Sequence, residues 1–143
     1  MVKIRKINSK DLSSIIKIGK KINEFQISNT GIFWSRDQLA RWTKSKNDIC
    51  LIAEDHNNIV GFVLFACHLP TKKSTFENIW VDSAYRKKGI ARHLIDRALK
   101  NLDKKNISYI MGFVSENNKE HLSFLKKVGF SVGNKGHWID KLI

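Results

Sequence analysis

The 143-residue sequence is poor in cysteine, in proline and in long apolar stretches. Its two cysteines, Cys50 and Cys67, are too few for a disulfide framework and show no zinc-ligand spacing. No stretch approaches the roughly 18 consecutive apolar residues that a membrane-spanning helix needs. Residues 1–7 alternate apolar and basic side chains, unlike the continuous apolar core of a signal peptide. These absences predict a reducing, cytoplasmic setting and no membrane association.

Acidic residues are also scarce. Lysine and arginine total 26 against 13 acidic residues, which gives a net charge of +13. Such an excess can attract a polyanion, such as nucleic acid, an anionic membrane, an acidic protein or a phosphate-rich cofactor. A solvated lysine-rich surface explains the charge equally well, because the lysines are dispersed along the chain.

The order of apolar patterns predicts one α/β domain with a mixed sheet over residues 1–143. The expected order is β-α-α-β-β-β-α-β-α-β-β, with no repeat or linker between the elements. Helices are expected from Asp11 to about Phe25, from Ser35, over 90–104 and over 119–128. Strands are expected at 2–7, 49–54, 59–67, 75–82, 108–114, 130–133 and 136–142.

Two helix starts carry capping signals. Asp11 is expected to cap the first helix with its carboxylate. Ser35 and Gln38 have the spacing of a capping box, and Trp34 before the cap can pack on Leu39.

Residues 79–91 place a buried strand, a short loop and the start of a helix in immediate succession. The first amides of a helix lack partners within it, and the helix dipole adds positive charge there. Gly89 allows close approach of a phosphate, and Arg86 adds charge nearby. The segment is neither a Walker loop nor a dinucleotide fingerprint. Its chemistry indicates an anion site, and a plain basic loop before a helix is the alternative.

The hexapeptide Arg86-Lys87-Lys88-Gly89-Ile90-Ala91, preceded by Val81-Asp82, resembles motif A of the GNAT superfamily of N-acetyltransferases, Arg/Gln-x-x-Gly-x-Gly/Ala. Asn118, followed eleven residues later by Gly129-Phe130, is similar to a second spacing of that family. The order of elements also matches, so the resemblance covers essentially the whole chain.

The resemblance implies acetyl-coenzyme A as the co-substrate. The two neighbouring strands near 75–82 and 108–114 would splay apart and leave a slot for the thioester. Asn118 would meet the lower pantetheine or the cysteamine end. Backbone groups of Ile79, Trp80 and Val81 would pair with the pantetheine arm. The pyrophosphate would be held by the amides of Arg86, Lys87, Lys88, Gly89, Ile90 and Ala91.

Glu77 is the expected catalytic base for the attacking amine. Strand alternation puts it on the same side as Ile79 and Val81. The alternative is an edge carboxylate that only attracts a cationic acceptor. A strand amide near Trp80 is expected to donate a hydrogen bond to the thioester carbonyl.

The sequence departs from the family at Leu125, where many relatives carry a tyrosine that protonates the departing thiolate. A slower enzyme is expected, or one that uses water, His121 or Ser123. His121 is expected on the surface of its helix. Cys67 is expected to be a buried structural thiol and not an acetyl-carrying nucleophile. The five histidines show no ligand spacing, so no metal is expected.

The predicted reaction is direct transfer of an acetyl group from acetyl-CoA to a protein N-terminus or a lysine. A short hairpin near Asn134 leaves the groove open, and Phe33 or Trp34 is expected to line the acceptor side. The alternatives are a small-molecule amine or polyamine acetyltransferase and a non-catalytic, CoA-binding or RNA-associated basic module. The charge indicates an acidic or nucleic-acid-associated partner, and the protein is expected to be a monomer or a homodimer.

Overall fold

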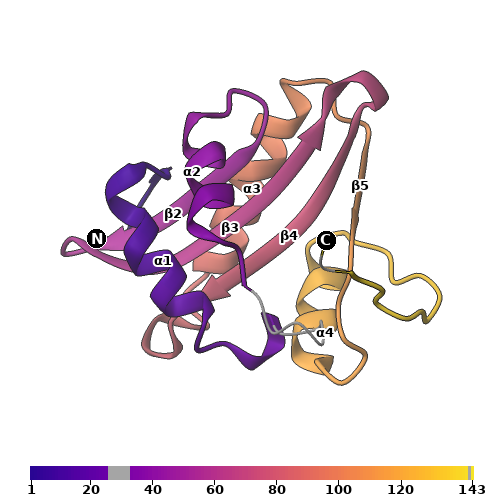
Figure 1. Ribbon diagram of the computed structural model, residues 1–143. Coiled ribbons are helices and arrows are strands. Elements are labelled where there is room, and N and C mark those ends of the chain that lie inside the picture. The colour runs from indigo at the N-terminus through magenta and orange to yellow at the C-terminus, as the bar shows by residue number, and fades with distance from the viewer. Residues whose placement is uncertain (26–32, 142) are drawn as a thin grey trace.

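The computed structural model describes residues 1–25, 33–141 and 143. It contains a five-stranded sheet in the order β1-β2-β3-β4-β5 with helices on both faces (Figure 1). The first four strands are antiparallel to their neighbours, and β5 runs parallel to β4. The mixed α/β fold expected from the sequence is therefore confirmed. The strands are β1 (Lys3–Lys6), β2 (Ile49–Asp55), β3 (Asn58–His68), β4 (Lys73–Val81) and β5 (Tyr109–Gly112), and the helices are α1 (Leu12–Gly19), α2 (Arg36–Lys44), α3 (Ile90–Asp103) and α4 (Lys119–Lys127).

Strands β2 and β3 are buried on both faces, because successive side chains point to opposite sides of the sheet. Helices α1 and α2 cover one face, and α3 covers the other (Figure 1). The first core contains Leu12, Ile15, Leu39, Cys50, Ile52, Phe62 and Leu64. The second contains Leu51, Val63, Phe65, Phe76, Leu94, Ile95, Ala98 and Leu125. This double layer fixes β3 and β4 rigidly beneath the helices.

The capping box expected at α2 is confirmed. The Ser35 hydroxyl oxygen accepts a hydrogen bond from the backbone N–H of Gln38, and the Gln38 side-chain oxygen accepts one from the backbone N–H of Ser35. Trp34 joins the core cluster that contains Leu39, and its ring lies 4.9 Å from that of Trp42.

The expected cap at Asp11 is wrong. The cap belongs to Asn8, whose side chain accepts a hydrogen bond from the Lys10 amide and so begins a short 3-10 turn over Ser9–Asp11. Asp11 makes no side-chain cap to α1. Its carboxylate instead accepts hydrogen bonds from the backbone N–H of Asn8, at 2.7 Å, and from the Arg5 side chain.

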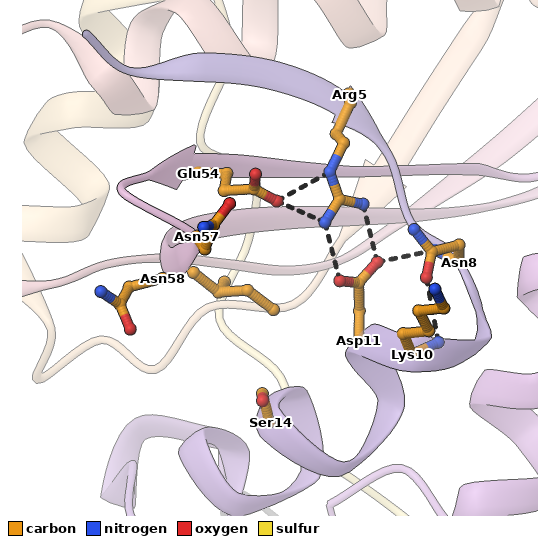
Figure 2. Close-up of a pocket in the computed structure, with 9 residues that line it drawn as sticks. Arg5, Asn8, Lys10, Asp11, Ser14, Glu54, Asn57 and Asn58 are labelled. Carbon is orange, nitrogen blue, oxygen red and sulfur yellow. Dashed lines mark hydrogen bonds and ion pairs between the residues drawn. The ribbon is translucent and has the colours of Figure 1, made fainter.

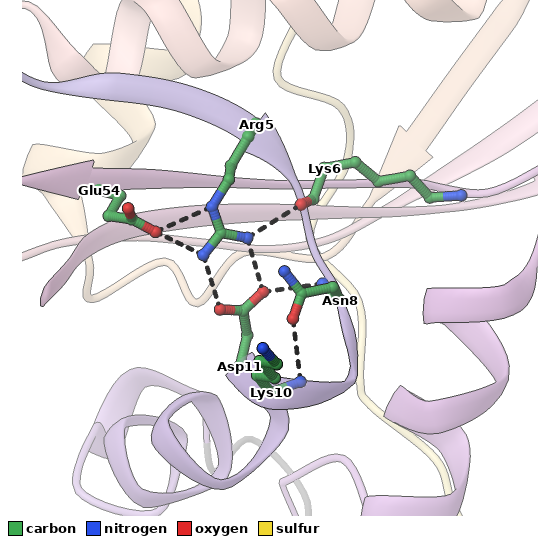
Figure 3. A network of polar contacts seen from close by, with 6 residues as sticks. All are labelled: Arg5, Lys6, Asn8, Lys10, Asp11 and Glu54. Carbon is green, nitrogen blue, oxygen red and sulfur yellow. Dashed lines mark hydrogen bonds and ion pairs between the residues drawn. The ribbon is translucent and has the colours of Figure 1, made fainter. Parts of the chain in front are cut away.

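Arg5 joins β1, β2 and the start of α1 (Figure 3). Its two terminal nitrogens donate to both oxygens of Asp11, at 2.8 and 2.9 Å, and its Nε donates to Glu54 at 2.8 Å. Further bonds to Glu54 and to the Lys6 carbonyl engage the remaining donors. Burial alone would raise the pKa of Asp11, but the hydrogen bonds from Arg5 and Asn8 outweigh it and the pKa is lowered.

The first helix is shorter than expected. It ends at Gly19, and a separate 3-10 turn, η2 (Asn23–Phe25), follows. A β-carbon on Gly19 would lie 2.1 Å from the Phe33 ring, so the close approach of that ring requires glycine.

The two strands expected at 130–133 and 136–142 are wrong for the part that the structure describes. Residues 130–141 contain no helix or strand, and residue 142 lies outside the described residues. Apolar alternation misled the prediction, because a strand also needs a paired edge and a buried face. Phe130 packs on the core, but Val132, Trp138 and Ile139 stay exposed, with Ile139 at 87%.

None of the helices in the described ranges combines the length and the apolar character of a membrane-spanning segment.

Loss of the Arg5 side chain is expected to lower the free energy of unfolding by roughly 2–4 kcal/mol at pH 7, because Asp11 is only 6% exposed and would keep an unpaired charge. The pKa of Asp11 is lowered in the folded state, so this stabilisation is present above about pH 4 and is lost as the pH falls further. Urea unfolding of Arg5→Ala at pH 7 and pH 3 measures both effects. The exposed Arg97→Ala is the control, and equal losses in the two variants would contradict the role of the network.

Candidate active site

The site begins where β4 and β5 part. Their parallel pairing runs from Lys73 opposite Tyr109 to Phe76 opposite Gly112 and then stops. Strand β4 continues to Val81, so its last five residues have no strand on the β5 side among the described residues. A β-carbon on Gly112 would lie 3.0 Å from the Phe76 carbonyl, so this glycine permits the last close pair. Beyond it, main-chain groups of β4 face an opening that an extended ligand can occupy.

Glu77 lies at a β-bulge beside this branch point. Phe76 pairs with Phe65, and Asn78 pairs with Leu64, which leaves Glu77 without a partner on β3. Phe76 and Ile79 both pack on the core beneath α3 although they are three positions apart. Simple alternation, which was expected to orient Glu77, therefore does not hold across this segment. Bulges re-aim side chains, and they are common next to active sites.

A cleft opens at the branch point, between β4, the residues that follow β5, η2 and the start of α4. It brings together three residues predicted from the sequence, Glu77, Ile79 and Asn118. The full lining consists of Glu24, Phe25, Phe76, Glu77, Asn78, Ile79, Phe113, Val114, Ser115, Asn118 and His121.

The Glu77 carboxyl group holds its proton more tightly than an ordinary glutamate. Burial, assisted by the negative charge of Asp48, raises the pKa of Glu77 to about 7. Its side chain has no hydrogen-bond partner in the described parts of the chain. A carboxyl group that changes protonation near neutral pH can accept a proton from a bound amine.

The predicted anion turn lies at the end of β4. Lys87 and Gly89 both have left-handed backbone angles, with φ of 59° and 80°. Gly89 is the N-cap of α3 and offers no side chain to the first helical amides. Alternation of left- and right-handed residues before a helix turns main-chain N–H groups toward a common concavity, which binds anions.

Side chains around the turn hold its shape. The Asp82 carboxylate accepts a hydrogen bond from the Ala84 amide at 2.9 Å, and Arg86 Nε donates to the Val81 carbonyl at 3.0 Å. The Lys88 ammonium lies 5.1 Å from the centre of the Tyr85 ring. Arg86 is therefore partly engaged with backbone, and Lys87 and Gly89 are the residues whose conformation shapes the site.

The other residues predicted for the site lie in different parts of the structure, and not all of them line the cleft. Trp80 packs on the α1/α2 side, with its ring 5.8 Å from Phe62, while Val81 packs beneath α3. The Asn118 side chain caps α4 by accepting a hydrogen bond from the His121 amide at 3.2 Å. Neither Phe33 nor Trp34 lines the cleft directly. Trp34 donates to the side chain of the lining residue Asn78, and Phe33 stacks on the lining residue Phe25.

The expectation that His121 is a surface residue is wrong. It is half-buried, it lines the cleft, and its Nε2 atom is inaccessible to solvent. A tertiary contact with the Phe76 ring of β4 helps to place it there, and no local sequence signal reveals that contact. Leu125, where relatives carry tyrosine, is a core residue with 5% exposure.

Cys67 lies outside the cleft. Its sulfur lies 3.4 Å from the Ser74 hydroxyl oxygen, and burial raises the pKa of the thiol. A thiol with a raised pKa is a poor nucleophile at neutral pH. Among the residues that the structure describes, no group of three or more histidine, cysteine, aspartate or glutamate side chains is arranged to hold a metal ion.

A larger hollow of about 450 Å³ lies between the β2–β3 turn and the start of α1 (Figure 2). Its walls carry Arg5, Asp11 and Glu54, whose charged groups already bind one another. Arg5 has its donors engaged within this network, so the hollow is explained by structural ion pairs, and the cleft at Glu77 is the better candidate for chemistry.

Comparison with known proteins agrees with this geometry. The sequence model of the acetyltransferase (GNAT) family matches residues 20–130, well over half of the chain. The chain belongs to the GNAT family. A Bacillus subtilis (strain 168) protein, YwnH, provisionally named a phosphinothricin acetyltransferase, is 32% identical over 84 residues. That match covers 56% of this chain and 52% of YwnH, so the chain spans about half the length of this relative.

Two solved structures show the same fold as this GNAT chain. The PaiA N-acetyltransferase of Thermoplasma acidophilum, solved with coenzyme A, has a TM-score of 0.80 at 22% identity and covers 95% of this chain and 93% of its own. The Escherichia coli ribosomal-protein-S18-alanine N-acetyltransferase has a TM-score of 0.72 at 19% identity, over 94% of this chain and 80% of its own.

Proposed function

We propose that this GNAT protein transfers an acetyl group from acetyl-coenzyme A to an amine. One observation carries the proposal. The β4–β5 pairing ends at Phe76 and Gly112, beside Glu77 with its raised pKa, and the open edge of β4 leads directly into the turn of Lys87 and Gly89 before α3.

Coenzyme A has the chemical parts that this path suits. In the proposed turn Arg86–Ala91, a pyrophosphate can accept hydrogen bonds from the amides that follow Arg86, with Lys87 and Lys88 supplying positive charge, while the Arg86 amide already donates to the Ser83 carbonyl at 3.4 Å. The pantetheine arm carries amide groups that can pair with the free edge of β4 over residues 79–81. The Asn118 amide group lies in the same cleft as Glu77 and can meet the lower end of that arm. The thioester would then lie near Glu77.

The transfer needs one base, one polarised carbonyl and one leaving sulfur. Glu77 accepts a proton from the bound ammonium group, directly or through water, and so frees the nitrogen lone pair. The nitrogen bonds to the carbonyl carbon, and the carbonyl π electrons move to oxygen, which accepts a hydrogen bond from a β4 amide near Trp80. The C–S bond then breaks and the sulfur leaves as a thiolate. Attack is direct, because Cys67 lies outside the cleft with a raised pKa.

A protein N-terminus or a lysine side chain is the acceptor that we favour. One GNAT structural relative is named for the alanine of a ribosomal protein, and the curated relative is named for the small molecule phosphinothricin, so membership of the family leaves the acceptor open. Residues 130–141 form no hairpin, and their side chains are largely exposed. An acceptor side without that cover suits an amine on a macromolecule, in the cytoplasm, where both cysteines stay free.

Glu77→Gln is expected to lower kcat by about 10²–10³-fold while the Kd of acetyl-CoA stays unchanged. In the wild-type protein kcat/KM should rise with pH through about 7, because the base must be ionised to accept a proton. The variant should lose this rise. Thiol release measured from pH 5.5 to 9 tests both effects, with the exposed Glu120→Gln as the matched control. A variant that keeps the wild-type rate would remove Glu77 from the reaction.

Gly89→Ala is expected to weaken acetyl-CoA binding by about 10–100-fold, which corresponds to the loss of one or two charge-assisted hydrogen bonds. A methyl group at a φ of 80° either strains the turn or stands against the phosphate. Calorimetric titration measures the affinity. Gly133→Ala is the control, because a β-carbon there meets nothing within 4 Å. Equal affinities in both variants would place the pyrophosphate elsewhere.

The net charge supports a second, partner-binding role. Three loops meet at the end of the sheet where β4 begins: the α2–β2, β3–β4 and α3–β5 loops. The Ser108 amide donates a hydrogen bond to the Lys72 carbonyl, and the Lys105 side chain donates one to the Lys46 carbonyl. We call this part of the surface the lysine end, and it comprises Lys44, Lys46, Lys72, Lys73, Lys104 and Lys105. It lies about 26 Å along β4 from the anion turn. Its charge favours an acidic or nucleic-acid-associated partner that brings the acceptor amine.

Retention on an RNA column should fall steeply with salt, because phosphate contacts release counterions. The charge reversal Lys72→Glu/Lys104→Glu should abolish retention, whereas Lys17→Glu/Lys126→Glu, with the same net charge, should retain binding. Equal losses in the two variants would show that net charge alone, and not the lysine end, attracts the polyanion.

A further inference from the structure

His121 occupies an unusual place at the start of α4. Its amide donates to the Asn118 side chain, which begins the helix, and its ring stands edge-on to Phe76, with the ring centres 6.1 Å apart and the planes at 86°. Both contact residues line the same cleft as Glu77. The imidazole is therefore held at the branch point of the sheet, in the cleft that Glu24 and Phe25 of η2 also line.

The Nε2 atom of His121 is buried without a partner. Less than 1 Å² of this atom is accessible, and no hydrogen bond reaches it from the described residues. Buried polar atoms in folded proteins are nearly always hydrogen-bonded, so an exception indicates strain, a ligand or a chemical role. An alanine or leucine would fill the same helical position without this penalty.

The other candidates for proton transfer to sulfur are poorly placed. Leu125 is a core side chain without a proton to give, and Ser123 is exposed and outside the cleft. Tyr85 donates its hydroxyl proton to Asp55 at 3.0 Å, and Tyr109 is 56% exposed near the far end of the β4–β5 pair. Neither tyrosine of the chain therefore lies in the cleft to replace the proton donor that is missing at Leu125.

We propose that His121 is a catalytic residue of the acetyl-transfer site and that its imidazole carries a proton from the attacking nitrogen to the departing sulfur. This inference rests on the proposed function. It assigns to one cleft residue the step for which the sequence has no tyrosine.

Two protons leave the attacking nitrogen during the transfer. Glu77 takes the first proton, which converts the ammonium group into the free amine. When the nitrogen bonds to the carbonyl carbon it becomes positively charged, and it gives its second proton to the neutral imidazole of His121. As the C–S bond breaks, its electron pair moves to sulfur, and the imidazolium returns that proton to the thiolate. The products are the amide and the free thiol, His121 ends neutral, and Glu77 releases the first proton to solvent.

The environment of His121 suits this exchange. Burial lowers its pKa, while the Glu24 carboxylate across the cleft acts in the opposite direction. The ring is therefore neutral at pH 7 and ready to accept a proton. Once protonated, it is a stronger acid than a thiol of pKa about 8.5, so transfer to the thiolate is downhill. The titratable groups that line the cleft beside it are Glu24 on η2 and Glu77 on β4.

Two variants separate chemistry from packing. His121→Phe keeps an aromatic ring against Phe76 but cannot carry a proton, and His121→Ala leaves a space that imidazole can enter. His137→Ala, at an exposed histidine, is the control. Acetyl-CoA affinity and turnover by the wild-type protein are measured first, with a pool of peptides and amines. A wild-type protein that binds no acetyl-CoA or releases no thiol would overturn the proposed function itself.

With an active wild-type protein, kcat is expected to fall about 10²-fold in both His121 variants, with the Kd of acetyl-CoA unchanged. Added imidazole should restore turnover in His121→Ala and should leave His121→Phe unaffected. Wild-type kcat in either variant overturns the role of His121 alone. The same conclusion follows if weaker acetyl-CoA binding accounts for the loss, or if imidazole leaves His121→Ala unchanged.

Discussion

The parting of β4 from β5 at Phe76 and Gly112 is the constraint on which the site depends. Paired strands would satisfy their own main-chain groups and leave no room for a ligand between them. Gly112 allows its backbone to lie close to Phe76 in the last residue pair of the two strands. The bulge at Glu77 then interrupts the alternation of side chains in the unpaired part of β4. The cores on both faces hold β3 and β4 in place and so fix the edge of β4 that borders the opening.

Burial then sets the chemistry of the cleft. The same loss of solvent that raises the pKa of Glu77 lowers the pKa of His121, since in both groups it disfavours the charged form. An acidic and a basic group thus approach each other in proton affinity, as in sites that move protons in both directions. The anion turn needs no such tuning, because main-chain amides and the helix dipole do not titrate.

Local chemistry explains which features could be predicted. The capping box at Ser35 depends on residues three positions apart, and the turn before α3 depends on Gly89 and its basic neighbours. The predictions that proved wrong concern residues whose partners are distant in sequence. Asp11 lost its expected cap because Arg5 binds it, and residues 130–133 lack the neighbouring strand that their alternation anticipates.

The amino-acid sequence by itself determined the order of helices and strands down to α4, the place of the Gly89 turn before α3 and membership of the GNAT family, because each depends on short patterns of residues. The tertiary structure alone decided where β4 and β5 separate, that Glu77 occupies a bulge, and that His121 is buried beside it. These features arise from strand register and from packing between distant segments. Proton affinity in a cleft depends on that packing, which no local pattern encodes.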